Sequence, residues 1–345
     1  MGTKLKDIIE KKDTSFKELA GKRLVVDSFN ILYQFLSSIR QADGTPLMDS
    51  KGKITSYLSG LFFRTAKLLE YDIKPIFVFD GEAPKLKKTE RERRAEVKED
   101  AKKKYEIAKE REDIDAMKKF ASRTSVLSSE MIQEAKELVE AMGLPVVQAP
   151  SEGEAQAAFM VNNGDAYAEV SQDYDCLLYG VKRVIHNLTV SEKRKKPGAV
   201  GFIKVSPEIV ELEDNLKNLE INQEQLIIIG ILVGTDYNIG GIKGIGPKNA
   251  LKLVKEYKNK YDEMFEKLKW SDYFDVGWRE IFDIIKKMPV TKNYKIEFNP
   301  IDTEKIKKIM VERHEFGEER IDSALAKLKQ RVKEKSQTGL GAWVK

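Results

Sequence analysis

The sequence predicts an α/β fold with a mostly parallel central sheet flanked by helices. Two observations predict it: short apolar runs typical of buried strands, and helix-periodic segments that alternate with those runs. Strands that alternate with helices form βαβ units, whose parallel sheet is covered on both faces. The 345 residues are enough for one large domain, which we expect to span residues 1–335.

The elements follow this plan in chain order. Residues 23–27 (RLVVD) and 75–80 (PIFVFD) are apolar runs, and residues 54–70 between them repeat apolar side chains at helical spacing. The same alternation then recurs with strands predicted at 145–152 and 167–175 and helices at 130–143 and 154–163. Residues 226–236 (LIIIGILVGTD) fit either a strand or a helix by pattern, and the flanking polar residues and Gly234 favour a buried helix that ends in glycine.

The composition narrows the chemistry. The formal charge of +5 permits a polyanionic partner without requiring one. One cysteine, Cys176, excludes an internal disulfide or a multi-thiolate metal site, and two histidines leave little for a catalytic triad or a zinc site. An enzyme with this composition would depend on carboxylates, lysines and metal ions. No secretion signal or membrane-spanning run is present, so we expect an intracellular, soluble protein.

Acidic residues end the predicted strands. Asp27, Asp80, Glu152 and Asp173 each close an apolar run, Asp175 follows at once, and Asp236 comes directly after 226–235. A single acid in such a place is usually a turn residue or a helix cap. Because ligands of open α/β sheets bind beyond the carboxyl ends of the strands, several such acids predict one cluster. Packed anions repel one another unless they are protonated or hold cations.

The stretch SEGEAQAA (151–158) has two interpretations. Ser151 and Glu154 have the spacing of a capping box, which would make the acids structural. Alternatively, Glu152 and Glu154 join the acidic cluster, and Ser151 alone caps the helix.

Residues 85–123 differ from the rest of the chain. They hold 15 Lys and Arg against 10 Asp and Glu, with few large apolar residues. They fit either a solvated helical excursion or a helical arm that contacts phosphates. On one helix, Lys87, Arg91 and Arg94 would share a face.

Five blocks of the sequence carry a family resemblance: LVVDSFNILYQFL, IFVFDGEAPKLK, QAPSEGEAQAA, SQDYDCLLYG and LVGTDYNIGGIKGIGPKNAL. In this order and spacing they resemble the flap endonucleases of archaeal and eukaryotic replication and repair, most closely the archaeal branch. The resemblance implies that 85–123 forms a helical arch and 240–257 a helix-two-turn-helix DNA-binding motif.

The resemblance also implies a metal site for two Mg²⁺ ions, with Mn²⁺ as a substitute. Its ligands would be Asp27, Asp80, Glu152, Glu154, Asp173, Asp175 and Asp236. Mg²⁺ prefers such oxygen ligands, and two ions roughly 3.5–4 Å apart can activate water and stabilise a leaving oxygen. Asp80, Glu152 and Glu154 would favour one ion and Asp173 and Asp175 the other.

Further residues follow from the same resemblance. Lys87 and Arg94 match the basic residues that face the scissile phosphate, and Tyr33 matches an aromatic residue on which a base stacks, unless it is an ordinary core tyrosine. The remaining DNA-binding candidates are Arg40, Arg91, Lys243, Gly244, Gly246 and Lys248.

The glycine-rich stretch 240–257 fits either a plain interhelical turn or a phosphate-binding loop. Gly241, Gly244 and Gly246 would let the backbone approach a phosphate, and Pro247 suits the first position of the next helix. In the family this motif also holds a monovalent cation such as K⁺.

The tail 336–345 resembles a peptide that binds the sliding clamp (PCNA). Gln337, Leu340, Trp343 and Val344 match the four key positions, with Val344 in place of a second aromatic residue. A frayed terminus is the alternative. Two other departures from the family pattern, Thr3 and Ala83, are expected to lie away from the chemistry.

Together these features predict a monomeric, structure-specific 5′ flap endonuclease, with 5′-to-3′ exonuclease activity as an accompanying expectation, acting on branched DNA with a 5′ flap. Three rival interpretations remain. They are a 5′ exonuclease or Holliday-junction resolvase relative, a phosphotransferase or phosphatase that uses Asp173 and Asp175, and a non-catalytic clamp-associated DNA-binding protein.

Overall fold

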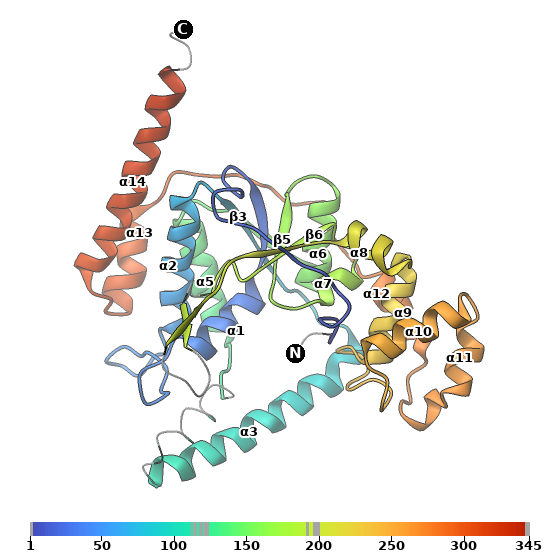
Figure 1. Cartoon of the computed structure of the whole chain (residues 1–345). Helices are drawn as coiled ribbons and strands as arrows, with labels where there is room; N and C mark the ends of the chain where they lie inside the picture. Colours follow the sequence, from blue (N-terminus) through green and yellow to red (C-terminus); the bar gives the residue numbers. More distant parts are fainter. Residues whose placement is uncertain are drawn as a thin grey trace.

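One seven-stranded sheet forms the centre of the computed structural model, and helices cover both of its faces (Figure 1). The structure describes residues 3–341 apart from 112, 114, 115, 117–119, 121–123, 191, 192 and 196–200. The strand order is β1-β9-β6-β5-β2-β3-β4. These strands are β1 (Lys12–Asp13), β2 (Arg23–Asp27), β3 (Lys74–Phe79), β4 (Val146–Gln148), β5 (Ala168–Val170), β6 (Arg183–His186) and β9 (Glu208–Glu211).

The sheet is mostly parallel, as the sequence predicts. Strands β4, β3, β2, β5 and β6 run parallel, whereas β9 and β1 add an antiparallel edge. Val25 on β2 lies between Ile76 on β3 and Glu169 on β5, so strands distant in the sequence meet at the centre. A separate antiparallel pair joins β7 (Lys193–Lys195) to β8 (Phe202–Lys204).

Two hydrophobic cores sandwich this sheet. On one side β2 and β3 present Leu24, Val26 and Phe77 to one set of helices. These helices are α1 (Ser28–Ser38), α2 (Ser56–Glu70), α5 (Ser129–Ala141), α13 (Thr303–Lys307) and α14 (Glu318–Gly341), with a π-helical turn at Lys308–Arg313. On the other side Val25 and Val78 pack against the second set. That set is α6 (Gly153–Asn162), α7 (Asp175–Leu178), α8 (Leu212–Leu219), α9 (Gln223–Val233), α10 (Pro247–Tyr257), α11 (Tyr261–Lys267) and α12 (Trp278–Lys286), with a 3₁₀ turn at Trp270–Asp272.

The apolar run that begins at residue 226 lies in helix α9, the structure that the sequence pattern favours, and the helix ends at Val233. Asn222 caps α9 through a capping box with Gln225, and Gly234 ends it at a φ of 109°, where a β-carbon would be strained. No helix in the described part of the chain is long and apolar enough to cross a membrane.

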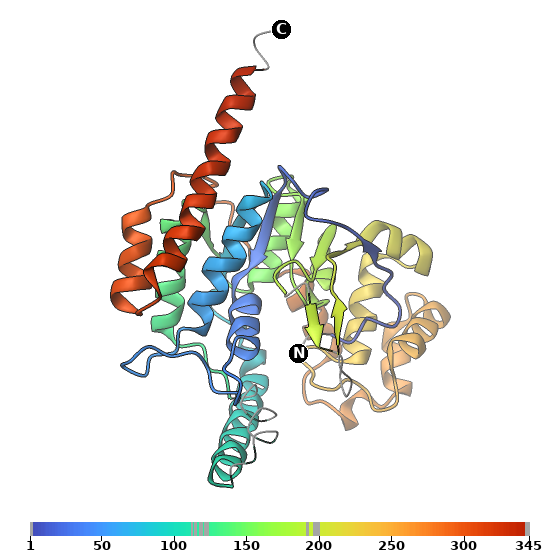
Figure 2. The same cartoon turned by 60° about the vertical axis from the view of Figure 1, so that its left-hand side comes forward.

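The basic segment begins as one long helix. A 3₁₀ turn at Lys85–Lys87 leads into α3 (Lys88–Glu110), which projects away from the sheet (Figures 1 and 2). Lys87 is the last residue of the turn directly before α3, and Arg91 and Arg94 follow within the helix, so a shared face for the three stays a prediction. Most of residues 112–123, the distal part of the expected arch, lie outside the described residues.

Candidate nuclease site

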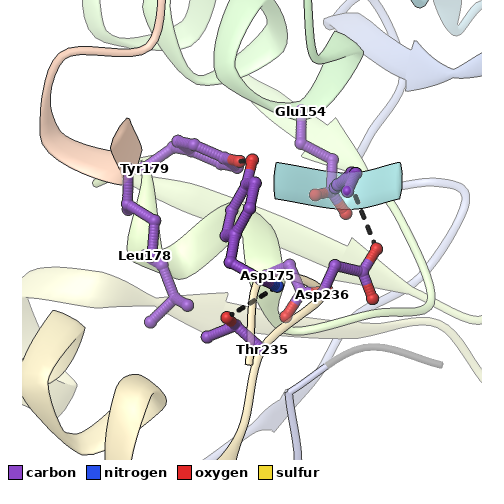
Figure 3. A pocket seen from close by; sticks show the side chains of 9 residues that line it. Glu154, Asp175, Leu178, Tyr179, Thr235 and Asp236 are labelled. Carbon is purple, nitrogen blue, oxygen red and sulfur yellow. Dashed lines mark hydrogen bonds and ion pairs between the residues drawn. The ribbon is translucent and has the colours of Figure 1, made fainter. Parts of the chain in front are cut away.

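The seven acids predicted as metal ligands sit where strands and helices end at one edge of the sheet. Asp27 closes β2, Asp80 follows β3, Glu152 is the N-cap residue of α6, and Glu154 lies in that helix's first turn. Asp173 follows β5, Asp175 is the first residue of α7, and Asp236 follows α9. The carboxylates of Glu154, Asp175 and Asp236 gather around one pocket, which Lys87, Thr235 and Tyr237 also line (Figure 3).

The acids lie close enough together for their charges to repel one another. Burial raises the pKa of Asp27 to about 8, and the nearby charges of Asp80, Asp173 and Glu152 add to the rise. Burial, and then Asp175 and Asp27, raise the pKa of Glu154 well above its ordinary value. Since anions crowded in this way destabilise one another, the cluster favours a bound cation or proton.

Each of several acids has a local hydrogen-bond donor. Asp27 accepts from the backbone N of Asn30 at 3.1 Å, and Asp173 accepts from the Asn30 side-chain nitrogen at 2.8 Å, so one asparagine joins two acids. Asp80 Oδ1 accepts from the backbone N of Gly153 at 2.8 Å. These bonds hold the acids at the sheet edge in defined orientations.

Thr3 contacts the site, contrary to the expectation from the sequence. Its backbone N donates to Asp175 Oδ1 at 2.6 Å, and its hydroxyl donates to the same oxygen. Burial raises the pKa of Asp175 to about 6, and these two bonds from Thr3 limit the rise. A separation of 172 residues hides this contact from any local pattern in the sequence.

Lys87 lies inside the acidic cluster. Its Nζ lies 2.5 Å from Glu152 Oε2, 3.2 Å from Asp236 Oδ2 and 5.6 Å from the ring centroid of Tyr237. Burial alone would lower the pKa of Lys87, but Glu152 and Asp236 raise it above its ordinary value, so the side chain is an ammonium ion. A permanent positive charge therefore sits beside the acids at the base of α3.

The donor set fits a hard divalent cation such as Mg²⁺, because it consists of carboxylate oxygens alone. Among the described residues, no three Asp, Glu, His or Cys side chains are close enough together to hold an ion without some adjustment. Several of the acids have other partners in this structure: Lys87 pairs with Glu152, Thr3 donates to Asp175, and Asn30 donates to Asp173. A cation would share or replace these partners.

The capping interpretation of SEGEAQAA is wrong. The N-cap residue of α6 is Glu152, with no side-chain capping bond, and the Ser151 hydroxyl donates to the carbonyl of Glu82 at 2.8 Å. Glu154 accepts no hydrogen bond from any residue that the structure describes, so its carboxylate is available to the cluster.

A further buried acid, Glu169, was not predicted from the sequence. It lies in the middle of β5, is fully buried, and neither carboxylate oxygen has a hydrogen-bond partner. Burial, and then the charge of Asp27, raise its pKa well above the ordinary value. Burial therefore favours the protonated, neutral form of Glu169. The only signal in the sequence was a Glu within a strand that should be apolar on both faces.

The residues predicted to contact DNA are distributed around this site. Tyr33 on α1 is 37% exposed and lies under Lys98 of α3, whose Nζ is 5.0 Å from its ring centroid. It is therefore no ordinary core tyrosine. Arg40 is engaged within the protein, since it donates to the Gly44 carbonyl at 3.0 Å and to Ser125 Oγ at 2.7 Å. Arg91 and Arg94 lie in the first turns of α3.

The loop between α9 and α10 divides its glycines between two roles. Gly244 and Gly246 have open space where a β-carbon would stand, and Lys243 and Lys248 beside them are exposed. A β-carbon on Gly241 would lie 2.3 Å from the backbone of Val233, so Gly241 permits packing inside the protein rather than the approach of a phosphate. Pro247 is the first residue of α10, as expected.

The expected clamp-binding tail begins inside a helix. Helix α14 continues past residue 335 to Gly341, so Gln337 and Leu340 belong to its last turns. Trp343 and Val344 lie outside the described residues.

An acidic cluster at the carboxyl edge of a mostly parallel sheet, beside a projecting basic helix, defines an α/β protein equipped to process phosphodiesters. The XPG N-terminal domain matches residues 1–101, and the XPG I-region matches residues 143–236. Flap endonuclease 1 of Staphylothermus marinus is 49% identical over 99% of each chain, and that of Pyrococcus furiosus is 47% identical over 100% of each. The solved flap endonuclease-1 from Methanococcus jannaschii is 43% identical, covers 97% of this chain and all of its own, and superposes with a TM-score of 0.76.

The chain therefore belongs to the flap endonuclease family of structure-specific 5′ nucleases.

Proposed function

We propose that this chain is a divalent-metal-dependent flap endonuclease that acts as a monomer and hydrolyses a phosphodiester at the base of a 5′ flap. The observation that carries the proposal is the buried cluster of carboxylates at the sheet edge, where Glu154, Asp175 and Asp236 line one pocket. A weaker companion proposal is 5′-to-3′ exonuclease activity at the same site.

The metal ligands in this proposal are Asp27, Asp80, Glu152, Glu154, Asp173, Asp175 and Asp236. Bound Mg²⁺ or Mn²⁺ ions would supply an activated water and charge stabilisation for the leaving oxygen. Asn30, Gly153 and Thr3 hold individual acids in place through the hydrogen bonds described above.

Lys87 and Arg94 act on the DNA. The Lys87 ammonium is already within 3.2 Å of two acids, so it stands where a phosphate drawn to the cluster would arrive. There it can neutralise charge that develops on the phosphate. Arg94, about two helical turns further on, adds a second positive charge.

Binding of the DNA duplex is assigned to the α9–α10 loop and its lysines. The N-terminus of α10 offers backbone N–H groups to a phosphate without reading the base sequence, and Lys243 and Lys248 add charge. The carbonyls of the same loop would hold K⁺ or a similar ion. Tyr33 provides a stacking surface for one base, and the tail from 336 binds the sliding clamp.

The test is cleavage of 5′-labelled DNA by the whole chain. Four substrates are compared, namely a double flap, a 3′ flap, a four-way junction and a blunt duplex, each with Mg²⁺ and with chelator. Release of the 5′ flap in Mg²⁺ alone supports the proposal. Preferential cutting of the four-way junction would replace the substrate with that of a resolvase.

A matched variant separates chemistry from binding. Asp173→Ala removes a central acid, so turnover should fall by about a thousandfold or more, whereas binding of the double flap should remain within about threefold. Cleavage by Asp173→Ala near the wild-type rate would remove Asp173 from the metal site.

A further inference from the structure

Thr3, near the start of the chain, lies at the acidic cluster. Thr3 is only 3% exposed, and both its backbone N and its hydroxyl donate to a single oxygen, Oδ1 of Asp175. Asp175 is the first residue of α7 and lines the pocket shared with Glu154 and Asp236 (Figure 3). Residues at the start of the chain thus reach an acid assigned to the metal site.

This segment is fixed by the fold rather than frayed. Leu5 and Ile9 are buried in the core beside α9. The backbone N of Glu10 donates to Asn215 Oδ1 at 2.7 Å, and Lys12 then pairs with Ile209 of β9. Thr3 is therefore held in place by packing and by backbone pairing over the next ten residues.

We propose that Thr3 is a positioning residue for the proposed metal site: its hydroxyl and backbone N–H together occupy Oδ1 of Asp175 and thereby reserve Oδ2 for a divalent cation. Among the described residues, no donor is bonded to Oδ2. A carboxylate held by two donors on one oxygen loses its freedom to rotate, so the second oxygen keeps one orientation. The inference rests on the proposed function, because it assigns Asp175 as a metal ligand.

The hydroxyl is the group that the side chain contributes. The backbone N–H would remain with any residue except proline, whereas a valine of nearly the same shape would lose the second donor. Hydrogen-bond partners of ligating carboxylates commonly contribute 10- to 100-fold to metal affinity. Removing one of two such donors should lie at the lower end of this range.

The experiment measures metal binding without cleavage. Mn²⁺ is titrated calorimetrically into the full chain in the absence of DNA, for the wild type, Thr3→Val and Thr3→Ser. The matched control is Thr14→Val, which removes a hydroxyl that donates to Glu18 at 2.9 Å, away from the acids. Thr3→Val is expected to weaken one Mn²⁺ site by about tenfold, while Thr3→Ser and Thr14→Val bind like the wild type.

Cleavage of the double flap at graded Mg²⁺ adds a second readout. Thr3→Val should need about tenfold more Mg²⁺ for half-maximal rate, with a rate at saturating Mg²⁺ within about twofold of wild type. Unchanged Mn²⁺ affinity in Thr3→Val would overturn the proposal, as would equal weakening in Thr3→Ser or in Thr14→Val. If the wild type cleaves no flap, the proposed function fails, yet the Mn²⁺ titration still decides the role of Thr3.

Discussion

At the scale of single residues, Glu169 is an ionisable side chain in an unfavourable, fully buried position. Glu169 lies in register with Val25 and Val184 on the neighbouring strands, and its carboxyl has no hydrogen-bond partner among the described residues. A buried polar group without a partner costs about 1–3 kcal/mol of stability. Glu169 therefore lowers the stability of the fold, and it lies close enough to Asp27 for the two charges to interact.

Replacement of Glu169 by leucine, which has a similar volume, should raise the free energy of unfolding by about 1–3 kcal/mol at pH 7. Because burial raises the pKa of Glu169, the native protein keeps the proton that the unfolded chain releases above its ordinary pKa of 4.5. The glutamate's contribution to stability is therefore greatest below pH 4.5 and is lost as the pH rises toward the native pKa.

Urea unfolding of the wild type and of Glu169→Leu at pH 4 and pH 7 checks this sign. The advantage of leucine should be larger at pH 7. An equal advantage at both values would mean that burial does not raise the pKa of Glu169 above that of the unfolded chain.

At the scale of elements, we expect the positive charge of α3 to affect the rate of cleavage more than the binding of DNA. Its base joins the acidic cluster through Lys87, and its surface further out is a series of ion pairs such as Lys103 with Glu99 at 3.0 Å. Paired surface charges of this kind contribute little to stability. The arm is therefore suited to contact a polyanion rather than to stabilise the fold.

Arg94→Ala is expected to slow single-turnover cleavage by about a hundredfold, while the dissociation constant of the double flap rises less than about fivefold. The reason is that a charge near the reacting phosphate stabilises the transition state more than the bound DNA. Lys103→Ala, further along the same helix, is the control and should change neither quantity by more than about twofold. Equal losses in rate and binding for Arg94→Ala would make it a general phosphate contact.

The α9–α10 loop should act through salt-dependent phosphate binding. Alanine at both Lys243 and Lys248 removes two exposed charges beside open glycines, so the slope of log K against log salt should decrease by about two. The control is Lys255→Ala at the other end of α10, whose ammonium is paired with Glu220 at 2.8 Å. Filter binding of duplex DNA between low and moderate salt measures the slope. An unchanged slope would remove this loop from the interface.

The elements also separate what the sequence could predict from what it could not. Strands β2 and β3 and helix α9 were predictable because apolar runs and glycine stops are local signals, and acids at their ends follow from the direction of parallel strands. The antiparallel edge formed by β1 and β9 was missed, since two short strands nearly 200 residues apart leave no periodic pattern. The Thr3 contact and the place of Lys87 between two acids are tertiary facts of the same kind.

At the scale of the whole molecule, the segment just before α14 packs back onto earlier parts of the chain through His314. The buried ring of His314 lies between Asp49 and Glu134, and the hydroxyl of Tyr57 donates to Glu134 at 2.5 Å. This network joins the loop before α2, α2 itself and α5 to the end of the π-helical turn. All four residues of this network lie well before residue 336, so the network does not depend on residues 336–345.

Deletion of residues 336–345 should leave flap cleavage by the isolated chain within about twofold of the full-length rate, because no acid or DNA contact assigned above is removed. Binding to a sliding clamp, measured by size-exclusion chromatography, should be lost. The double variant Leu340→Ser with Trp343→Ala is a matched test that keeps the chain length. A truncated chain that still binds the clamp would place the contact elsewhere.

The order of the acids along the chain has a consequence for synthesis. Asp27 and Asp80 emerge from the ribosome early, but the strand that pairs with β2 at the centre of the sheet is β5, and Asp236 comes later still. A nascent chain that ends before Asp236 cannot bring all seven carboxylates together, and their assembly also depends on pairing between distant strands. A polypeptide stalled or degraded before Asp236 would therefore lack at least one acid of the proposed metal site.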